Sequence, residues 1–286
     1  MAAATVTRRI LIVDDDAAIR YLLAWPLRKG GHAVEEAGDG QAAIEQLDTS
    51  PYDVVLLDVG LPGGMNGLDV LAHARAAATP PIVIMMTADD TEETFLAAVR
   101  GQAYRFMRKP FPPGAMVEAV NEALQSPASA VLAIEVLSAR PEWIELVVPC
   151  VLEMTDRVEQ FVMQLDAHLP ESVRQSVAQA FRELMNNAIE WGGKLDPNRK
   201  VRISCVRGKK MRLYRIADPG EGFDDARLRH AAISNPEDNP VQHAEIREQQ
   251  GIRPGGLGLL ITRSLVDELI YNERRNEVIL IKYISD

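Results

Sequence analysis

The sequence is poor in cysteine and contains no long apolar run. Its two cysteines, Cys150 and Cys205, are too few for a disulfide framework, so we interpret both as reduced, half-buried thiols. No apolar run approaches the roughly 18 residues that a membrane-spanning helix needs. Residues 1–9 also lack the apolar core and cleavage pattern of a secretion signal. We therefore expect a cytoplasmic protein that neither spans nor binds a membrane.

Positive charge is also scarce. The chain has 31 lysine and arginine residues against 41 aspartate and glutamate residues, which gives a formal net charge of −10 at pH 7. Nucleic-acid binding needs clustered basic side chains that contact phosphates, so we expect no nucleic-acid partner. The apolar fraction of 47% is that of an ordinary globular protein, and 286 residues are many for one core. Two domains are expected.

The first predicted domain covers residues 8–125, where short apolar runs alternate with amphipathic stretches. The runs Ile10–Val13, Val54–Leu57 and Ile82–Met86 are continuous and rich in β-branched residues, as in strands buried on both faces of a parallel sheet. Weaker strand candidates are residues 33–36 and 104–107, and helical patterns cover residues 17–29, 40–48, 67–78, 91–100 and 113–124. This alternation predicts a doubly wound α/β domain with five parallel strands.

The second predicted domain covers residues 143–286, and residues 126–142 form a linker and the start of that domain. Strands are expected at residues 131–137, 143–148, 200–206, 211–217 and 277–284, and helices at residues 151–167, 171–191 and 257–270. Residues 225–254 form a long polar segment, and such loops inside compact domains are usually functional. Strands with helices packed on one side predict an α+β fold.

Three carboxylates are expected to meet at one edge of the first sheet. Asp14, Asp15 and Asp58 each follow a predicted strand, and like charges held close together need a compensating cation. Oxygen ligands of this kind suit Mg²⁺. Lys109 adds a positive charge where an anion would bind, and Thr87 supplies a hydroxyl group. A carboxylate in this setting is equipped to attack a phosphoryl group.

The residues of this site resemble those of the receiver domain of bacterial response regulators. The resemblance implies that Asp58 is the phospho-acceptor and that an upstream histidine kinase is the phosphate donor. It also implies that Asp14 and Asp15 are the acidic pair, with Asp15 a direct Mg²⁺ ligand. The backbone carbonyl of Gly60 would be a further ligand.

Further positions agree with the same resemblance. Thr87 and Phe106 occupy its switch positions, although Phe106 reads equally well as a packed core aromatic. Lys109 precedes Pro110 at the position of the family's lysine, where the peptide bond is often cis. One departure is the loop of residues 63–67, which is one residue longer than usual.

A second set of polar residues lies in the second predicted domain. Glu183 and Asn187 are four residues apart on a predicted helix and share one face, where they could act as a base and as a Mg²⁺ ligand. Asp218 follows a predicted strand, and its carboxylate can accept a hydrogen bond from an exocyclic amine.

Glycines accompany these polar residues. Gly220 and Gly222 allow the backbone to approach a flat ligand closely. Gly256 and Gly258 lie immediately before a predicted helix, where backbone N–H groups and the positive end of the helix favour an anion. Together these residues predict a nucleotide site.

These three groups of residues, around Glu183 and Asn187, around Asp218, and at Gly256 and Gly258, resemble the motifs of the Bergerat-type (GHKL) ATPases. Among these they are most similar to the anti-sigma-factor serine/threonine kinases. The resemblance implies that ATP and Mg²⁺ are the cofactors, that Asn187 is the Mg²⁺ ligand, Glu183 the catalytic base and Asp218 the reader of adenine. Gly220, Gly222, Gly256 and Gly258 would line the nucleotide, and residues 230–254 would form a lid. Trp191 departs from the family, which often has histidine there.

The two resemblances together imply a two-component response regulator in which phosphorylation of Asp58 controls an ATP-binding output domain. That domain would sequester a sigma factor or phosphorylate a serine of a STAS-type anti-anti-sigma protein, and a homodimer is expected. An alternative is an ATP-binding adaptor that transfers no phosphate, and a weaker one is control of the receiver's own dephosphorylation. A histidine kinase is disfavoured, since His168 and the other histidines lack the acidic neighbour of an acceptor histidine.

Overall fold

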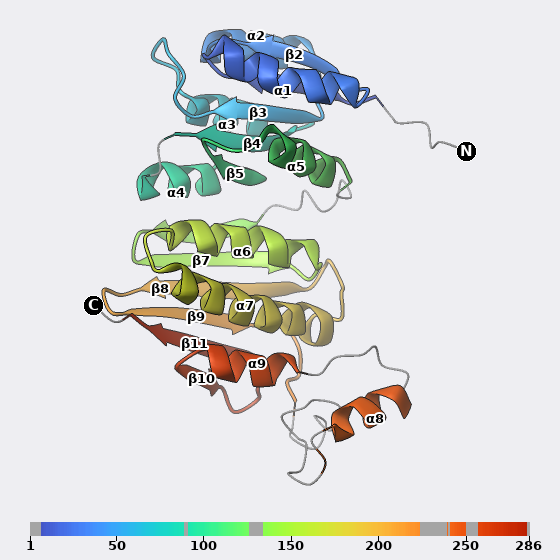
Figure 1. The fold of residues 1–286 in the computed structure, drawn as a ribbon, viewed down its shortest axis with the longest axis vertical. Coiled ribbons are helices and arrows are strands. Elements are labelled where there is room, and N and C mark those ends of the chain that lie inside the picture. Colours follow the sequence, from blue (N-terminus) through green and yellow to red (C-terminus); the bar gives the residue numbers. More distant parts are fainter. Residues whose placement is uncertain are drawn as a thin grey trace. The chain divides into compact units, whose positions relative to one another are not determined.

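The computed structural model of the chain divides into two compact units, Met1–Ala133 and Ile134–Asp286 (Figure 1). The structure describes residues 7–88, 91–125, 134–223, 239, 241–249 and 257–284. Among the helices in these ranges, none has the length and apolar character that crossing a membrane requires.

The first unit is a parallel sheet with helices on both faces. Its elements are β1 (Arg9–Val13), α1 (Ala17–Lys29), β2 (Ala33–Ala37), α2 (Gly40–Thr49), β3 (Val54–Asp58), α3 (Gly67–Ala76), β4 (Ile82–Thr87), α4 (Glu92–Arg100), β5 (Arg105–Arg108) and α5 (Pro113–Gln125). The five strands pair in parallel in the order β2-β1-β3-β4-β5. The predicted doubly wound α/β fold is therefore confirmed.

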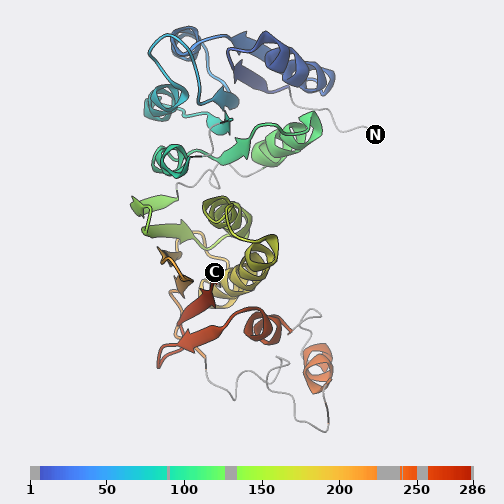
Figure 2. The same ribbon diagram turned by 60° about the vertical axis from the view of Figure 1, so that its left-hand side comes forward.

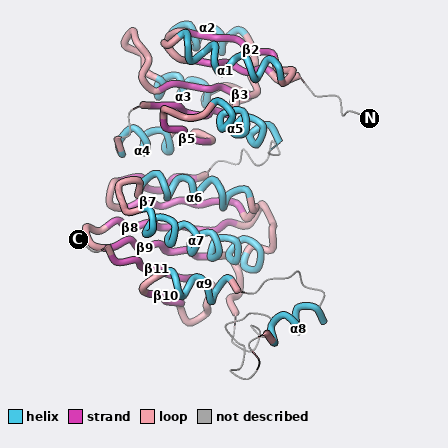
Figure 3. The backbone as a smooth tube through the Cα atoms, in the orientation of Figure 1, coloured by secondary structure: helices cyan, strands magenta, loops and turns pink. Residues whose placement is uncertain are grey.

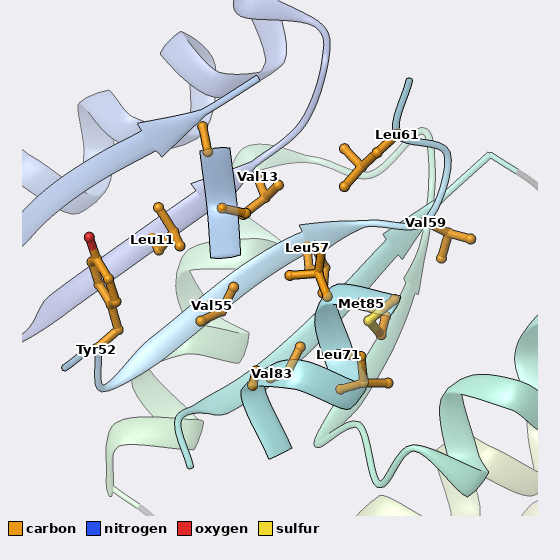
Figure 4. Packing of buried hydrophobic residues seen from close by; sticks show 14 of the residues in the cluster. Leu11, Val13, Tyr52, Val55, Leu57, Val59, Leu61, Leu71, Val83 and Met85 are labelled. Atoms are coloured by element: carbon orange, nitrogen blue, oxygen red, sulfur yellow. The ribbon is translucent and has the colours of Figure 1, made fainter. Parts of the chain in front are cut away.

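Alternate residues of the central strands enter two separate cores. Leu11 and Leu57 pack on the side of α2, α3 and α4, and Figure 4 shows them with Leu71 of α3. Their neighbours Ile10 and Leu56 pack on the side of α1 and α5. Because both faces of β1, β3 and β4 are buried, these strands are apolar at almost every position, and this explains the continuous runs in the sequence.

The loop after β3 is the one predicted from the sequence to be one residue longer than usual, and two of its glycines adopt a special conformation. Gly63 and Gly64 have φ angles of +88° and +84°, in the left-handed region that glycine adopts without steric cost. The side chain of Asn66 then accepts hydrogen bonds from the backbone N–H groups of Leu68 and Asp69. The Asp69 carboxylate accepts one in return from the Asn66 N–H, and this capping box starts α3.

The second unit is an antiparallel sheet with the helices Glu153–Leu165, Glu171–Asn187 and Gly258–Leu265 on one face (Figures 2 and 3). Its elements are β6 (Glu135–Arg140), β7 (Trp143–Pro149), α6 (Glu153–Leu165), α7 (Glu171–Asn187), the π-helix η1 (Ala188–Gly192), β8 (Lys200–Arg207), β9 (Met211–Ala217), α8 (Gln242–Gln249), α9 (Gly258–Leu265), β10 (Glu268–Tyr271) and β11 (Glu277–Tyr283). The six strands follow the order β10-β11-β9-β8-β7-β6. This arrangement confirms the predicted α+β fold.

The structure corrects several element boundaries. The helix predicted for residues 257–270 ends at Leu265, and residues 268–271 form β10, which pairs with β11. Pairing across the Asn272–Asn276 turn satisfies the backbone of this segment better than one further helical turn. The strand predicted for residues 131–137 runs instead to Arg140, which pairs with Trp143. The polar segment 225–254, most of which lies outside the described residues, contains α8.

Candidate functional sites

The carboxyl ends of three neighbouring strands bring together the first set of predicted residues. Asp14 directly follows β1, Asp58 is the last residue of β3, and Thr87 is the last residue of β4. The three are buried, with exposed fractions of 0%, 6% and 1%. Parallel strands end at the same edge of a sheet, so functional side chains gather there.

Lys109 completes this cluster from the loop after β5. Its Nζ donates a hydrogen bond of 2.6 Å to Oδ2 of Asp14 and lies 3.1 Å from Oδ1 of Asp58. The backbone N–H of Lys109 donates to the carbonyl of Thr87 at 2.7 Å. The bond to Pro110 is cis, as the resemblance implied. One ammonium group is thus shared by two buried carboxylates.

The electrostatics of the cluster reflect its burial. Burial raises the pKa of Asp58, the hydrogen bond and charge of Lys109 oppose this rise, and the charge of Asp14 adds to it. Burial lowers the pKa of Lys109, but the hydrogen bonds to Asp14 and Asp58 and the charges of these two carboxylates together outweigh that effect and raise it. Burial therefore makes a charged Asp58 costly, and Lys109 offsets part of this cost.

Three carboxylates fit a metal ion at this edge. One oxygen each of Asp14, Asp15 and Asp58 can be chosen so that all three lie within 4.8 Å of one another. Three negative charges beside one ammonium leave two in excess, and an all-oxygen ligand set suits a hard divalent cation. The backbone N–H of Gly60 hydrogen-bonds the Asp58 carboxylate, whereas metal ligation by the Gly60 carbonyl stays a prediction.

Phe106 is packed against a helix in this structure. Its ring meets that of Phe95 on α4 edge-to-face, with centroids 5.0 Å apart and planes at 87°. Such an aromatic pair is favourable beyond its buried area. The switch role of Phe106 therefore stays a prediction for another state of the domain.

Glu183 and Gly258 meet where α7 and α9 lie side by side (Figures 1 and 2). A Cβ atom on Gly258 would lie 2.3 Å from Oε2 of Glu183, so any other residue at this position would make the Glu183 carboxylate move. The hydroxyl of Thr262 donates to the Gly258 carbonyl at 2.9 Å in the first turn of α9. Asn187 lies one turn beyond Glu183 on α7, whereas Gly256 lies outside the described residues.

Asp218 lies in the loop that follows β9. Its Oδ1 accepts a hydrogen bond of 2.7 Å from the backbone N–H of Gly220. Burial raises the pKa of Asp218, and the Gly220 N–H and the charge of Arg199 oppose that rise. Gly222 has a φ of +81°, and a Cβ atom there would lie 1.6 Å from the carbonyl oxygen of Arg274. Gly222 thus fits this loop against the β10–β11 turn, and its contact with a nucleotide stays a prediction.

Three residues that support Asp218 were missed by the sequence reasoning. Gly192 ends η1, and a Cβ atom on it would lie 2.2 Å from Oδ1 of Asp218. Arg199 donates to the carbonyl of Pro219 at 2.5 Å, and Asn276 accepts from the Asp218 N–H at 2.9 Å. Only the glycine pair at 192–193, just after a helical pattern, gave a signal in the sequence.

Two family models match the chain along most of its length. Residues 10–121 match the response regulator receiver domain, and residues 151–282 match the histidine kinase-like ATPase domain, which has a GHKL-type fold. The chain is a receiver domain followed by a histidine kinase-like ATPase domain. The first resemblance drawn from the sequence is confirmed, and so is the GHKL fold of the second.

Known proteins resemble parts of this receiver–ATPase chain. The DNA-binding response regulator MtrA of Mycobacterium tuberculosis H37Rv is 39% identical over 121 residues, which are 42% of this chain and 52% of MtrA. The transcriptional regulatory protein TcrA of the same organism is 38% identical over 103 residues, 36% of this chain and 40% of TcrA. The chain spans about half the length of the curated relatives it matches.

A solved structure also matches in part. The CheY-like receiver domain protein from Methanospirillum hungatei JF-1 is 29% identical, with a TM-score of 0.40, and the match covers 41% of this chain and 94% of that one.

Proposed function

We propose that the chain is a two-component response regulator in which phosphorylation of Asp58 controls an ATP-binding output domain. The observation that carries this proposal is the ammonium of Lys109 between the buried carboxylates of Asp14 and Asp58. Receiver domains are phosphorylated by histidine kinases, so an upstream histidine kinase is the proposed donor.

The first step is the transfer of a phosphoryl group to Asp58. A carboxylate oxygen of Asp58 attacks phosphorus, the bond from phosphorus to the donor imidazole breaks, and the imidazole leaves as histidine. Mg²⁺ held by Asp14, Asp15, Asp58 and the Gly60 carbonyl would offset the charge of the phosphoryl oxygens. Lys109, 3.1 Å from Oδ1 of Asp58, would pair with one of these oxygens, and the hydroxyl of the buried Thr87 would donate a hydrogen bond to another.

The second site would hold ATP along α7 and η1. Gly258 lies against Glu183 at one end, and Asp218 lies against Gly192 at the other. The nine steps from Glu183 to Gly192 span roughly 13 Å at a helical rise of about 1.5 Å per residue, which suits an extended nucleotide. Asp218 would accept a hydrogen bond from the adenine amine, and Asn187 would hold Mg²⁺. Gly220, Gly222, Gly256 and Gly258 would line the ligand.

The output reaction would be serine phosphorylation. Glu183 takes the proton of a serine hydroxyl, the hydroxyl oxygen attacks the γ-phosphorus of ATP, and ADP leaves. The carboxylate of Glu183 beside the N-terminal end of α9 supports this role, because phosphates bind at such helix ends. The proposed partner is a STAS-type anti-anti-sigma protein, with a sigma factor as the target of sequestration. A homodimer is also proposed and is tested by the mass of the protein in solution.

Labelled ATP tests the proposal. The full chain is incubated with γ-labelled ATP and STAS-type proteins, with and without beryllofluoride, which occupies the acceptor carboxylate as a phosphoryl analogue. We expect a partner serine to become labelled. The yield of label should change when beryllofluoride is added to the wild-type chain and should not change in an Asp58→Asn variant. Glu183→Gln should bind ATP with unchanged affinity and transfer none.

Two outcomes count against parts of the proposal. If ATP binds but no partner is labelled in either state, the kinase activity is wrong and the ATP-binding adaptor takes its place. If the wild-type chain binds no nucleotide, the whole output site is wrong.

A further inference from the structure

The carboxylate of Asp218 lies between two glycine backbones. A Cβ atom on Gly192 would lie 2.2 Å from Oδ1 and 2.3 Å from Cγ of Asp218. A Cβ atom on Gly220 would lie 2.7 Å from the same Oδ1 and 2.9 Å from the Cα of Gly192. Contacts this short involve a carboxylate packed against backbone, so a side chain at position 192 would displace Asp218. The side chain of Asp218 can therefore adopt this rotamer only because Gly192 and Gly220 have no side chains.

The backbone of the same loop is held from a second direction. The N–H of Asp218 donates to the carbonyl of Asn276 at 2.9 Å. The side-chain amide of Asn276 in turn donates to the carbonyls of Asp218 and Gly220, at 3.4 Å and 3.2 Å. Asn276 is the residue just before β11, so this amide ties the loop to the start of that strand.

These contacts leave one oxygen of Asp218 for a ligand. Oδ1 already accepts from the Gly220 N–H, whereas Oδ2 accepts no hydrogen bond from the described part of the chain. A carboxylate oxygen accepts a hydrogen bond from an amine and repels a keto oxygen. The direction in which Oδ2 points therefore decides which base the site takes.

We propose that Gly192 and Asn276 are positioning residues that aim Asp218 and thereby set the preference of the site for a 6-amino over a 6-keto purine. Gly192 does so by leaving room for the carboxylate, and Asn276 by fixing the loop that carries it. The inference rests on the proposed nucleotide site and adds to it the determinants of base selectivity.

The ratio of two affinities tests this role. The dissociation constants of ATP and inosine triphosphate are measured on the full chain by competition with a fluorescent ATP analogue. The two ligands differ at the 6-position of the base, so the wild type should prefer ATP by at least about tenfold. Gly192→Ala and Asn276→Ala should each reduce that ratio to about threefold or less.

Matched substitutions separate selectivity from general damage. Gly208→Ala changes a glycine of the β8–β9 turn, and Gln175→Ala removes an exposed amide on α7; both should keep the wild-type ratio. Circular dichroism checks that each variant is folded, and Asn276→Ala provides the test if Gly192→Ala does not fold. The inference is overturned if Asn276→Ala and a folded Gly192→Ala keep the wild-type ratio, even with both affinities reduced. If the wild type binds neither ligand, the proposed nucleotide site itself fails, which is a different result.

Discussion

At the scale of single residues, the ammonium group of Lys109 compensates the buried negative charge of the receiver site. Lys109 is 15% exposed at its side chain and contacts two carboxylates that are almost fully buried. Burying a charge is costly unless it is paired, and removing one partner of a buried pair leaves the other uncompensated. Lys109 therefore serves the stability of the domain as well as its chemistry.

Replacing Lys109 by methionine should destabilise the receiver domain by about 3 kcal/mol at pH 7 without added metal. Asp14 and Asp58 would then lie buried without a cation, and the already raised pKa of Asp58 would rise further. A carboxyl group whose pKa is higher in the folded than in the unfolded state stabilises the fold only when it is protonated. The loss should therefore shrink as the pH falls from 7 toward the unfolded value of about 4.

Calorimetry of the full chain measures this effect as a shift of the receiver's unfolding transition. Lys29→Met is the matched control, because it removes the other lysine of the first unit, where the ammonium lies over the exposed ring of Trp25. A cation–π contact of that kind contributes about 0.5 kcal/mol. Equal shifts for the two variants, or a loss that grows as the pH falls, would contradict the role given to Lys109.

At the scale of elements, the start of α3 is packed against the end of β3. A Cβ atom on Gly67 would lie 2.0 Å from the carbonyl oxygen of Asp58, and these are backbone atoms that cannot rotate away. The backbone N–H of Gly67 also donates to the carbonyl of Val59 at 3.0 Å. The helix thus fixes the strand end that carries Asp58.

Substituting alanine for Gly67 should separate α3 from β3 and cost about 1–3 kcal/mol of stability, as overpacking of a core does. Gly114→Ala is the matched control, because nothing lies within 4 Å of a Cβ atom there in the first turn of α5. That change should be neutral or stabilise by about 0.4–1 kcal/mol. Urea unfolding followed by Trp25 fluorescence, with Trp143 and Trp191 replaced by phenylalanine, reports the receiver alone. A Gly67→Ala variant as stable as Gly114→Ala would disprove the packing account.

The strands buried on both faces give the clearest pattern in the sequence, whereas for β10, at the edge of the second sheet, the sequence predicts the end of a helix. β1, β3 and β4 are continuous apolar runs because each has a core on either side. β10 is an edge strand of four residues that follows α9 after a two-residue gap, so its apolar residues extended the helical pattern. Residues 258–271 alone do not distinguish one long helix from a helix followed by a strand, because the strand that pairs with β10 begins six residues after β10 ends.

The same distinction applies to the sites. Asp14, Asp58 and Lys109 could be predicted because the ends of parallel strands converge by topology alone. The contacts of Gly192 and Asn276 with Asp218 depend on how η1 and the β10–β11 turn pack against one loop. Packing of this kind joins residues up to 58 positions apart and leaves no periodic signal in the sequence.

At the scale of the whole molecule, each unit carries one candidate site. The receiver site lies at the end of β1, β3 and β4 in the first unit, and the proposed nucleotide site lies along α7 and η1 in the second. Control of one site by the other requires a coupling free energy, which is reciprocal for binding. If a phosphoryl analogue at Asp58 changes the affinity of the chain for ATP, then ATP must change the affinity for that analogue by the same factor.

Ligand-dependent unfolding measures this coupling. Two separate units predict two calorimetric transitions, and a ligand stabilises the unit that binds it by about 2.7 kcal/mol at a hundred times its dissociation constant. For domains of this size each kcal/mol raises the transition temperature by roughly 2–4 °C.

Mg²⁺ with beryllofluoride should raise the transition temperature of the first unit, and this shift should vanish in Asp58→Asn. A non-hydrolysable ATP analogue should raise the transition of the second unit, and this shift should vanish in Asp218→Asn. If the sites are coupled, the two ligands together give shifts that differ from the sum of the separate ones, and strictly additive shifts at every concentration would show that Asp58 does not control nucleotide binding.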